Sequence, residues 1–462
     1  MYMKKNLILV AMASMMMASC VQEESLENQD VLSSAPKEIT FQAVVAKQSS
    51  RALIDGPQYK STDPSFGVWA RYNPDNENVG FQSFINNEEV VYHPEQSPSS
   101  GYWSIDYAND EDIKYWPGVG SLTFFAYSPF YYQENPEGKT KVVNNSTASS
   151  PQVGSYGIVF PNYNVKDHQQ TDLMVADVVK GLRSNIPAGA VGNASVYTGV
   201  PTVFRHKLAL IDEFVLKTSD DYDGKYAGDN NDAVTGNMRF FVEKIELMNL
   251  DMCGTYYGET YKLDGNKVND KWALPAEADR VKASYTWFDA KVAHDEHSST
   301  PNDGEGQNNG AHSANVSFDS YTDEDDVTHY GVEFGHSDTK TLNIKKFDRG
   351  EEYNRNPTIA NGYLLVLPQT FTAEQQKLRV TYYIKTFETG EEGDGTESQS
   401  NGNWAEPQES ITRTYDLAAI HSSNPQWPMN AKIKYTLMFS TQEIRWAPYV
   451  GAWESTDYTV DI

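Results

Sequence analysis

Short apolar runs separated by turn-forming residues recur along nearly the whole of this 462-residue chain. Over residues 38–46, Ile39, Phe41, Ala43 and Val45 alternate with their neighbours, which is the period-two pattern of a strand with one more apolar face. Long helical patterns are scarce, and 29 Tyr, 9 Trp, 31 Gly and 21 Pro suit many strands joined by frequent turns. The pattern predicts an all-β chain built from β-sandwiches.

A change in composition divides the predicted strands into two groups. Residues 180–199 are rich in Gly, Ala, Ser and Pro and have little periodicity, so we place a domain boundary there. We expect an N-terminal β-sandwich domain over residues 38–190 and a C-terminal one over 195–462. The other runs expected to form strands are 66–70, 89–92, 121–127, 172–176, 202–211, 244–250, 362–367, 378–384, 432–439 and 444–446.

Three polar insertions, rich in Asp, Asn, Gly and Ser, interrupt the second group at residues 218–236, 294–340 and 388–408. We expect them to be exposed loops. The middle insertion holds five of the nine histidines, and a surface metal site there is conceivable. The spacing matches no tight zinc pattern, so we predict a solvated insertion and no metal. The five histidines are His294, His297, His312, His329 and His336.

Charge and motif content exclude several classes of function. A net charge of −27, with an isoelectric point near 4.7, argues against nucleic acid as a partner. No phosphate-binding loop, dinucleotide fingerprint or nucleophile elbow is present, and no carboxylate pair stands out from the acidic background. We therefore expect no catalytic residues and no cofactor. His206 lies inside an apolar run, where we expect a hydrogen-bonded structural histidine.

The first residues have the features of an export signal. Lys4 and Lys5 precede an apolar run that is too short to span a bilayer, and small residues precede Cys20. We expect residues 1–19 to be a lipoprotein signal peptide and the Cys20 thiol to be acylated, for instance with palmitate. The alternative is an ordinary cleaved signal with a coincidental cysteine. Cys253 is the only other cysteine, so the mature chain would form no internal disulfide.

Residues 20–37 follow as an acidic segment without glycine or aromatic residues, which predicts a solvated tether. An acidic stretch after a lipidated cysteine resembles the surface-export signal of Bacteroidetes lipoproteins. That resemblance implies an anchor in the outer membrane through the lipid on Cys20, with the protein on the cell surface.

Several segments, taken together in order and spacing, resemble the fimbrillin-like pilins of Bacteroidales, which are the subunits of type V pili. The segments are Cys20, residues 39–41, 115–117, 122–127, 172–174, 204–209 and 363–369, Trp427, residues 434–437 and Trp453. The resemblance implies two transthyretin-like Greek-key β-sandwich domains in series. It also implies cleavage by an arginine-specific surface protease, and addition of a strand from a neighbouring pilin subunit into the groove that the removed first strand leaves.

Arg51 and Ala52 are the candidate processing site, because an arginine flanked by small residues directly follows the strand at 38–46. Cleavage there would release the lipid, the tether and a strand carrying Ile39, Phe41, Ala43 and Val45. The alternative is that Arg51 is a surface residue after a strand that remains in the sheet.

Near the end of the chain, Tyr458, Val460 and Ile462 alternate with polar residues and form a candidate donor strand. The alternative is an ordinary terminal strand or a frayed end. We expect a pilus subunit of the stalk or the tip that serves adhesion to host or bacterial surfaces and is found in fimbriae after processing. The rival expectation is a surface carbohydrate-binding lipoprotein, in which the abundant aromatic residues stack on sugars.

Overall fold

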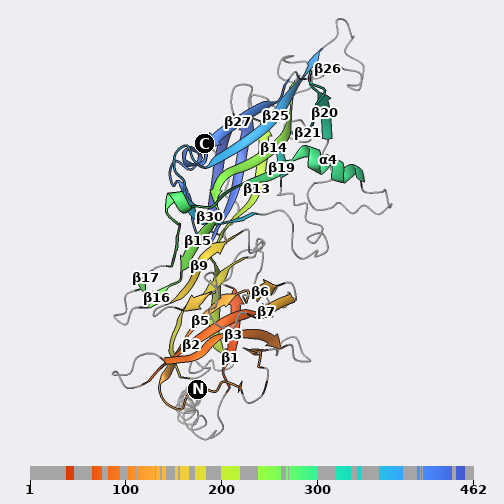
Figure 1. The fold of residues 1–462 in the computed structure, drawn as a ribbon. Coiled ribbons are helices and arrows are strands. Elements are labelled where there is room, and N and C mark those ends of the chain that lie inside the picture. The colour runs from red at the N-terminus through yellow and green to blue at the C-terminus, as the bar shows by residue number, and fades with distance from the viewer. Residues whose placement is uncertain are drawn as a thin grey trace, which may run out of the picture.

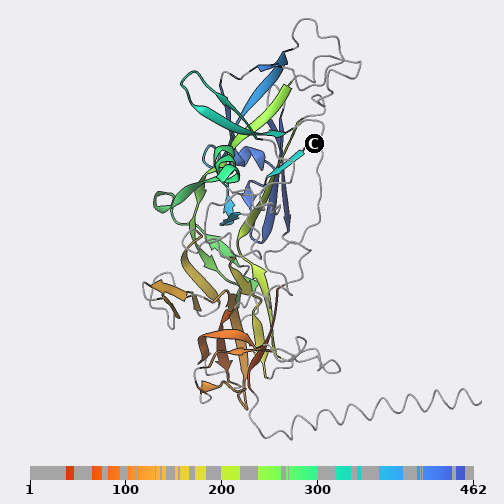
Figure 2. The same ribbon diagram turned by 90° about the vertical axis from the view of Figure 1, so that its right-hand side faces the viewer.

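The computed structural model places strands throughout the chain, in an elongated molecule whose first strands lie at one end and whose later strands lie at the other (Figures 1 and 2). The residues that the structure describes are 38–45, 65–74, 82–93, 102–107, 109, 112–130, 132–135, 138–141, 151–153, 157–165, 172–183, 199–218, 238–261, 267–268, 270–299, 318–334, 341–344, 364–388, 403–405, 407, 409–439 and 444–452.

The strands of the first half form one sheet that closes on itself. Because β10 is hydrogen-bonded to both β12 and β5, the first seven strands of the order below make a ring, which we call the N-terminal barrel. Its inward side chains form a single apolar core rich in phenylalanine. The order is β10 (Met174–Ala176), β12 (Val200–His206), β1 (Thr40–Val45), β4 (Tyr102–Ile105), β3 (Gln82–His93), β2 (Phe66–Asn73), β5 (Ser121–Ser128) and then β11 (Val179–Leu182).

The second half is a sandwich of two sheets around a separate core. One sheet has the order β22 (Thr341–Ile344), β13 (Ala209–Thr218), β29 (Ala431–Phe439) and β30 (Ile444–Ala452), and β23 (Leu364–Val366) also pairs with β13. The other has the order β20 (Phe318–Thr322), β21 (Thr328–Phe334), β14 (Met238–Asp251), β25 (Lys377–Glu388) and β26 (Asn403–Ala405), with β19 (Lys282–Asp289) on β14 and β27 (Ile411–Asp416) on β25. The prediction of an all-β fold is confirmed.

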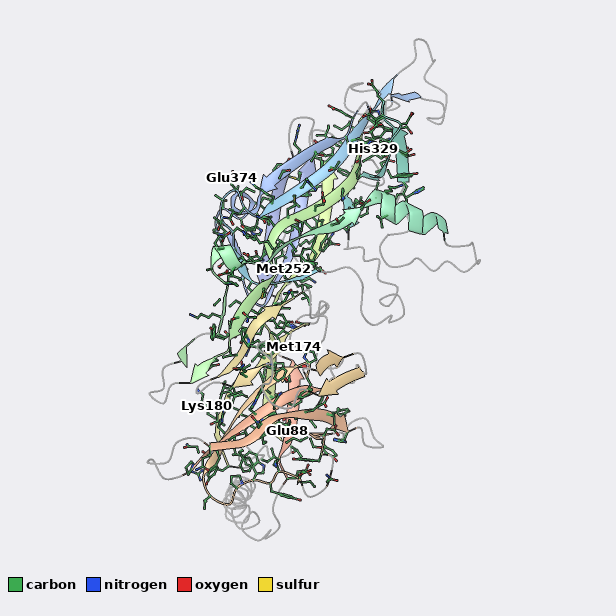
Figure 3. The ribbon with its side chains drawn as sticks, in the orientation of Figure 1. Glu88, Met174, Lys180, Met252, His329 and Glu374 are labelled. Carbon is green, nitrogen blue, oxygen red and sulfur yellow. The ribbon has the colours of Figure 1, made fainter. Side chains whose placement is uncertain are left out.

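A third sheet joins the two halves. It has the order β18 (Lys271–Ala273), β15 (Cys253–Tyr257), β9 (Ile158–Asn164) and β8 (Gln152–Val153), so it pairs a strand of the first half with one of the second. Side chains from both halves pack into one apolar cluster beside it. Met174 and Met252, labelled in Figure 3, lie on the two sides of this junction. The halves are therefore in contact through a continuous core.

The remaining elements are short. They are β6 (Tyr132–Asn135) with β7 (Gly138–Lys141), β16 (Thr260–Tyr261) with β17 (Lys267–Val268), β24 (Gln369–Thr370) with β28 (Gln426–Trp427), the helices α4 (Ala290–Ser299) and α5 (Leu417–Ile420), and the 3-10 turn η3 (Glu277–Asp279). Within the described ranges, no helix combines the length and apolarity that crossing a membrane requires.

Part of the middle insertion is folded, and the prediction of an exposed loop over the whole of 294–340 is wrong. The insertion contains the end of α4 and the hairpin β20–β21, which extends the β14 sheet. Tyr321, Val332 and Phe334 are buried. These apolar residues alternate with polar ones, and the acidic turn between the strands made the segment resemble a solvated loop.

Residues 202–211, expected as one strand at the start of the second half, form two strands in different sheets. β12 pairs with β1 and β10 in the N-terminal barrel, whereas β13 pairs with β29 in the second half. The chain passes from one sheet to the other at Lys207 and Leu208. The division into domains at residues 190–195 stays a prediction.

Candidate functional site

The strand expected at residues 38–46 is present as β1, which lies between two neighbours in the barrel wall. It runs parallel to β12, with Phe41 opposite Val200, and antiparallel to β4, with Phe41 opposite Trp103. Just before the strand, the backbone N–H of Ile39 donates to the Lys114 carbonyl oxygen at 2.9 Å. The first described strand is thus an internal strand of the sheet. We call the space that it occupies between β12 and β4 the β1 groove.

The inward side chains of β1 contribute to the barrel core. Phe41 and Ala43 on β1 are buried, as is Ile39 just before the strand, and the side chain of Val45 lies outside what the structure describes. Burial of a large apolar side chain contributes about 1.5–3 kcal/mol. The floor of the β1 groove is therefore apolar, and a chain without β1 would expose it together with the backbone edges of β12 and β4.

Phe41 is the aromatic anchor of the strand. Its ring meets those of Phe66 and Phe124 edge to face, with centroid distances of 5.7 Å and 6.0 Å. Such aromatic pairs add about 0.5–1.5 kcal/mol beyond the area that they bury. Phe66 in turn contacts the rings of Trp103 on β4 and Phe204 on β12. One aromatic cluster therefore links the strand to both of its neighbours.

The groove is narrow where Gly199 faces the backbone of Phe41. Gly199 lies so close that a Cβ atom on it would be 2.6 Å from the carbonyl carbon of Phe41 and 2.8 Å from its Cα. A cavity of about 10 Å³ beside Phe41 is lined mostly by apolar residues, among them Phe124 and Val200. The groove is therefore tight against the backbone of β1.

His206 is the structural histidine that the sequence predicted. Its ring is fully buried, and Nδ1 lies 2.6 Å from Oδ2 of Asp172, which precedes β10. Sequence reasoning did not identify this partner. The pairing of Met174 with His206 across β10 and β12 brings the two segments together.

Next to His206, a larger cavity of about 210 Å³ lies at the junction of the halves. The Lys207 ammonium pairs with Oδ2 of Asp270, which also accepts a hydrogen bond from the Tyr256 hydroxyl at 3.0 Å. The indole N–H of Trp272 donates to the Lys207 carbonyl oxygen at 2.6 Å. Burial and the nearby Asp270 carboxylate raise the pKa of Tyr256. These contacts hold the link between β12 and β13 against the joining sheet.

Two histidines of the middle insertion, His294 and His329, are engaged in packing or hydrogen bonds. His329 lies at the far end of the second half (Figure 3), with Nε2 3.0 Å from Oδ2 of Asp323 and its ring stacked on Tyr321. The hydrogen bond from His329 lowers the pKa of Asp323. His294 packs on Tyr330. Over the described ranges, no group of three or more His, Cys, Asp or Glu residues is arranged to hold a metal ion.

The aromatic residues that suggested sugar binding are used largely in cores. Trp69, Trp287 and Trp427 are among the largest fully buried side chains. The exposed tyrosines of the described residues, Tyr102, Tyr115 and Tyr257, lie on separate segments of the chain. This distribution favours a structural use of the aromatic content.

The other predicted site residues lie outside the described residues and stay predictions. They are Cys20, the processing site Arg51 and Ala52, and the candidate donor residues Tyr458, Val460 and Ile462.

Comparison with known proteins identifies the family. Residues 50–444 match the model of the fimbrillin-like family. No curated protein matches the chain. The solved structure of a fimbrial protein from Bacteroides vulgatus is similar at 15% identity and a TM-score of 0.45, covering 90% of this chain and 99% of that one. The tip fimbrial protein Mfa3 from Porphyromonas gingivalis, with C-terminal truncation, is similar at 10% identity and a TM-score of 0.29, covering 90% and 100%. Because the family model spans most of its length, this chain belongs to the fimbrillin-like family.

Proposed function

We propose that this chain is a structural, non-enzymatic subunit of a type V pilus on the cell surface, and that subunits join by exchange of strands in the β1 groove. Membership of the fimbrillin-like family supports a fimbrial role. The observation that carries the exchange mechanism is the position of β1, which is the first described strand and yet lies inside the sheet between β12 and β4.

In the proposed pathway, the precursor is exported as a lipoprotein and held in the outer membrane by the acylated Cys20. An arginine-specific surface protease then cuts between Arg51 and Ala52. Because β1 ends at Val45, before that site, the cut separates the whole strand from the rest of the barrel. The lipid, the tether and β1 can then leave together.

The emptied groove is a receptor for another strand. Its floor is the aromatic core around Phe66 and Phe124, and its rims are the backbone edges of β12 and β4. An added strand restores the ladder hydrogen bonds and fills the apolar floor with alternate side chains. We propose that Tyr458, Val460 and Ile462 of a neighbouring subunit supply it. A stalk subunit would both donate and accept, a tip subunit would only accept, and the assembled fibre would mediate adhesion.

The processing step is tested by Arg51→Lys, which keeps the positive charge but removes the arginine that the protease recognises. We expect the variant to stay lipid-anchored and monomeric, whereas Lys47→Ala in the same segment assembles normally. N-terminal sequencing of surface material and the mass distribution of extracted fibres are the measurements. The native protein should begin at Ala52 in fibres.

Fibres of normal length from Arg51→Lys, with an N-terminus still at the acylated Cys20, would contradict assembly by removal of β1. Fibres from that variant with a new N-terminus at another position before β2 would move the cleavage site but keep the mechanism.

A further inference from the structure

The hairpin β20–β21 forms a second small core on the face of the β14 sheet that points away from the sandwich. Phe241 on β14 alternates with the sandwich-core residues Phe240 and Val242 and so lies on that other face. The ring of Tyr383 on β25 stacks on Phe241, and the ring of Tyr321 on β20 meets Tyr383 at a centroid distance of 4.9 Å. Within the described residues, β20 pairs only with β21, so side-chain contacts rather than strand pairing hold β20 against β25.

Lys385 closes this small core at one side. Its Nζ atom lies 2.7 Å from Oδ2 of Asp319 on β20 and donates to the Ser320 carbonyl oxygen at 3.3 Å. The same atom lies 5.9 Å from the centre of the Phe241 ring. The side chains of Lys385 and Asp319 are 7% and 33% exposed. The lysine is therefore fixed in an aromatic setting, with one carboxylate in contact and little water around it.

The two groups are placed to react with each other. Oδ2 of Asp319 is bonded to Cγ, so Nζ of Lys385 approaches the separation of about 3–3.5 Å at which a bond to that carbon can form. Groups held in this way react with effective molarities of up to about 10⁵–10⁸ M, which offsets the unfavourable condensation of an amine and an acid in water. Condensation also replaces a largely buried ion pair by a neutral amide. We propose that Lys385 and Asp319 become joined by an amide bond between Nζ and Cγ.

The reaction needs no co-reactant. The lysine ammonium gives up one proton, and Nζ then attacks Cγ of Asp319. As the new N–C bond forms, a second proton leaves Nζ and one C–O bond of the carboxyl group breaks. The departing oxygen takes both protons and leaves as water, so an ammonium and a carboxylate become an amide and one water molecule. The partial exposure of Asp319 gives that water a way out.

Glu333 on β21 is the group that carries the protons from nitrogen to oxygen. It lies two residues from Gly331, which is opposite Asp319, so the two carboxyl groups are on the same face of the sheet. Burial raises the pKa of Glu333, Arg239 at 3.2 Å opposes this shift, and the Asp319 carboxylate adds to it. A carboxyl group that takes up a proton more readily than usual suits such a transfer.

The amide bond would link β20 covalently to β25 at the far end of the second half (Figure 1). It would close the segment between residues 319 and 385 into a loop, so this end of the subunit would resist unfolding by tension or attack by proteases. The inference goes beyond the proposed assembly and does not depend on it, because the β1 groove belongs to the N-terminal barrel.

The bond is tested by tryptic digestion of the full chain and mass spectrometry of the peptides. We expect a branched peptide that joins the segments of Asp319 and Lys385, is one water lighter than their sum and is not cut after Lys385. Lys385→Arg keeps the positive charge without an amine that can condense, so it should fold normally by circular dichroism but give two separate peptides. Lys434→Arg is the control, because Lys434 also lies 2.7 Å from a carboxylate, that of Glu213, but is 37% exposed. That variant should keep the branched peptide.

Complete cleavage after Lys385 in the native chain, with an Asp319 peptide of full mass, would overturn the proposal. The part played by Glu333 is tested by the rate at which the branched peptide appears in chain made by cell-free synthesis. We expect Glu333→Gln to slow its appearance roughly a hundredfold, the usual contribution of a general acid or base, and Glu213→Gln to leave the rate unchanged. Equal rates in Glu333→Gln and the native chain would overturn the role of Glu333 and leave the bond itself standing.

Discussion

Gly199 lies in close contact with the backbone of Phe41. A Cβ atom added to Gly199 would lie 2.8 Å from the Phe41 amide nitrogen and 2.6 Å from its carbonyl carbon. Contacts this short with backbone atoms cannot be relieved by rotating a side chain. The absence of a side chain just before β12 is thus what lets β1 lie as close to β12 as it does.

Gly199→Ala should therefore displace β1 from its neighbour. We expect a loss of about 1–3 kcal/mol, the usual cost of overpacking, and a lower thermal unfolding midpoint. Gly118→Ala is the control, because nothing lies within 4 Å of a Cβ atom at Gly118. If the two variants melt at the same temperature, the close approach of Gly199 to β1 has no energetic consequence.

Phe41→Ala should loosen β1 while leaving its backbone pairing in place. Removal of a buried phenylalanine costs about 3–5 kcal/mol. In a chain cut once by a protease at a site inserted after Lys47, with a fluorophore on β1, we expect the variant to release β1 faster than the native sequence does. Phe371→Ala removes the same side chain from the core of the second half and should lower stability without speeding that release. Equal release rates in both variants would show that β1 is held mainly by its backbone.

Lys207→Met should weaken the junction of the two halves. The side chains of Lys207 and Asp270 are only 8% and 24% exposed, so the remaining Asp270 carboxylate would be poorly solvated. We expect a loss of about 1–3 kcal/mol, below the range for fully buried pairs. In the double variant with Asp270→Asn, part of that loss should be recovered. The exposed neighbour Lys271 is the control site, where Lys271→Met should be neutral.

His421 should make the second half less stable in acid. Burial lowers its pKa to about 4, and its Nε2 lies 2.8 Å from the Tyr435 hydroxyl, which also accepts from the Trp427 indole. Burial favours the neutral imidazole, which shares a hydrogen bond with this hydroxyl. The unfolded chain, with an ordinary histidine pKa near 6.5, binds more protons than the folded chain between these two values.

The resulting stabilisation is fully present above pH 6.5 and is lost as the pH falls to about 4, by at most about 3 kcal/mol. We expect His421→Gln to unfold with a shallower pH dependence than the native protein over this interval, as measured by urea denaturation. Parallel curves for the two proteins would show that His421 does not titrate differently on folding.

The sequence predicted individual strands well where apolar residues alternate with other residues and only the apolar face is buried. The alternation of Ile39, Phe41 and Ala43 indicated which face of β1 is buried. The apolar setting of His206 indicated a structural histidine. The hairpin at residues 318–334 was missed because its few apolar residues, such as Tyr321 and Val332, lie among many polar ones. Their burial depends on the sheet that β14 provides.

By itself, the sequence determined that the chain is all-β, that Phe41 faces a core and that the segments of a fimbrillin-like protein occur in order. Only the tertiary structure decided that β1 lies between β4 and the distant β12, and that Gly199 and a small cavity flank its aromatic anchor. The physical reason is that a period of two fixes the buried face of a strand but not its partners. Pairing depends on the packing of side chains that are far apart along the chain.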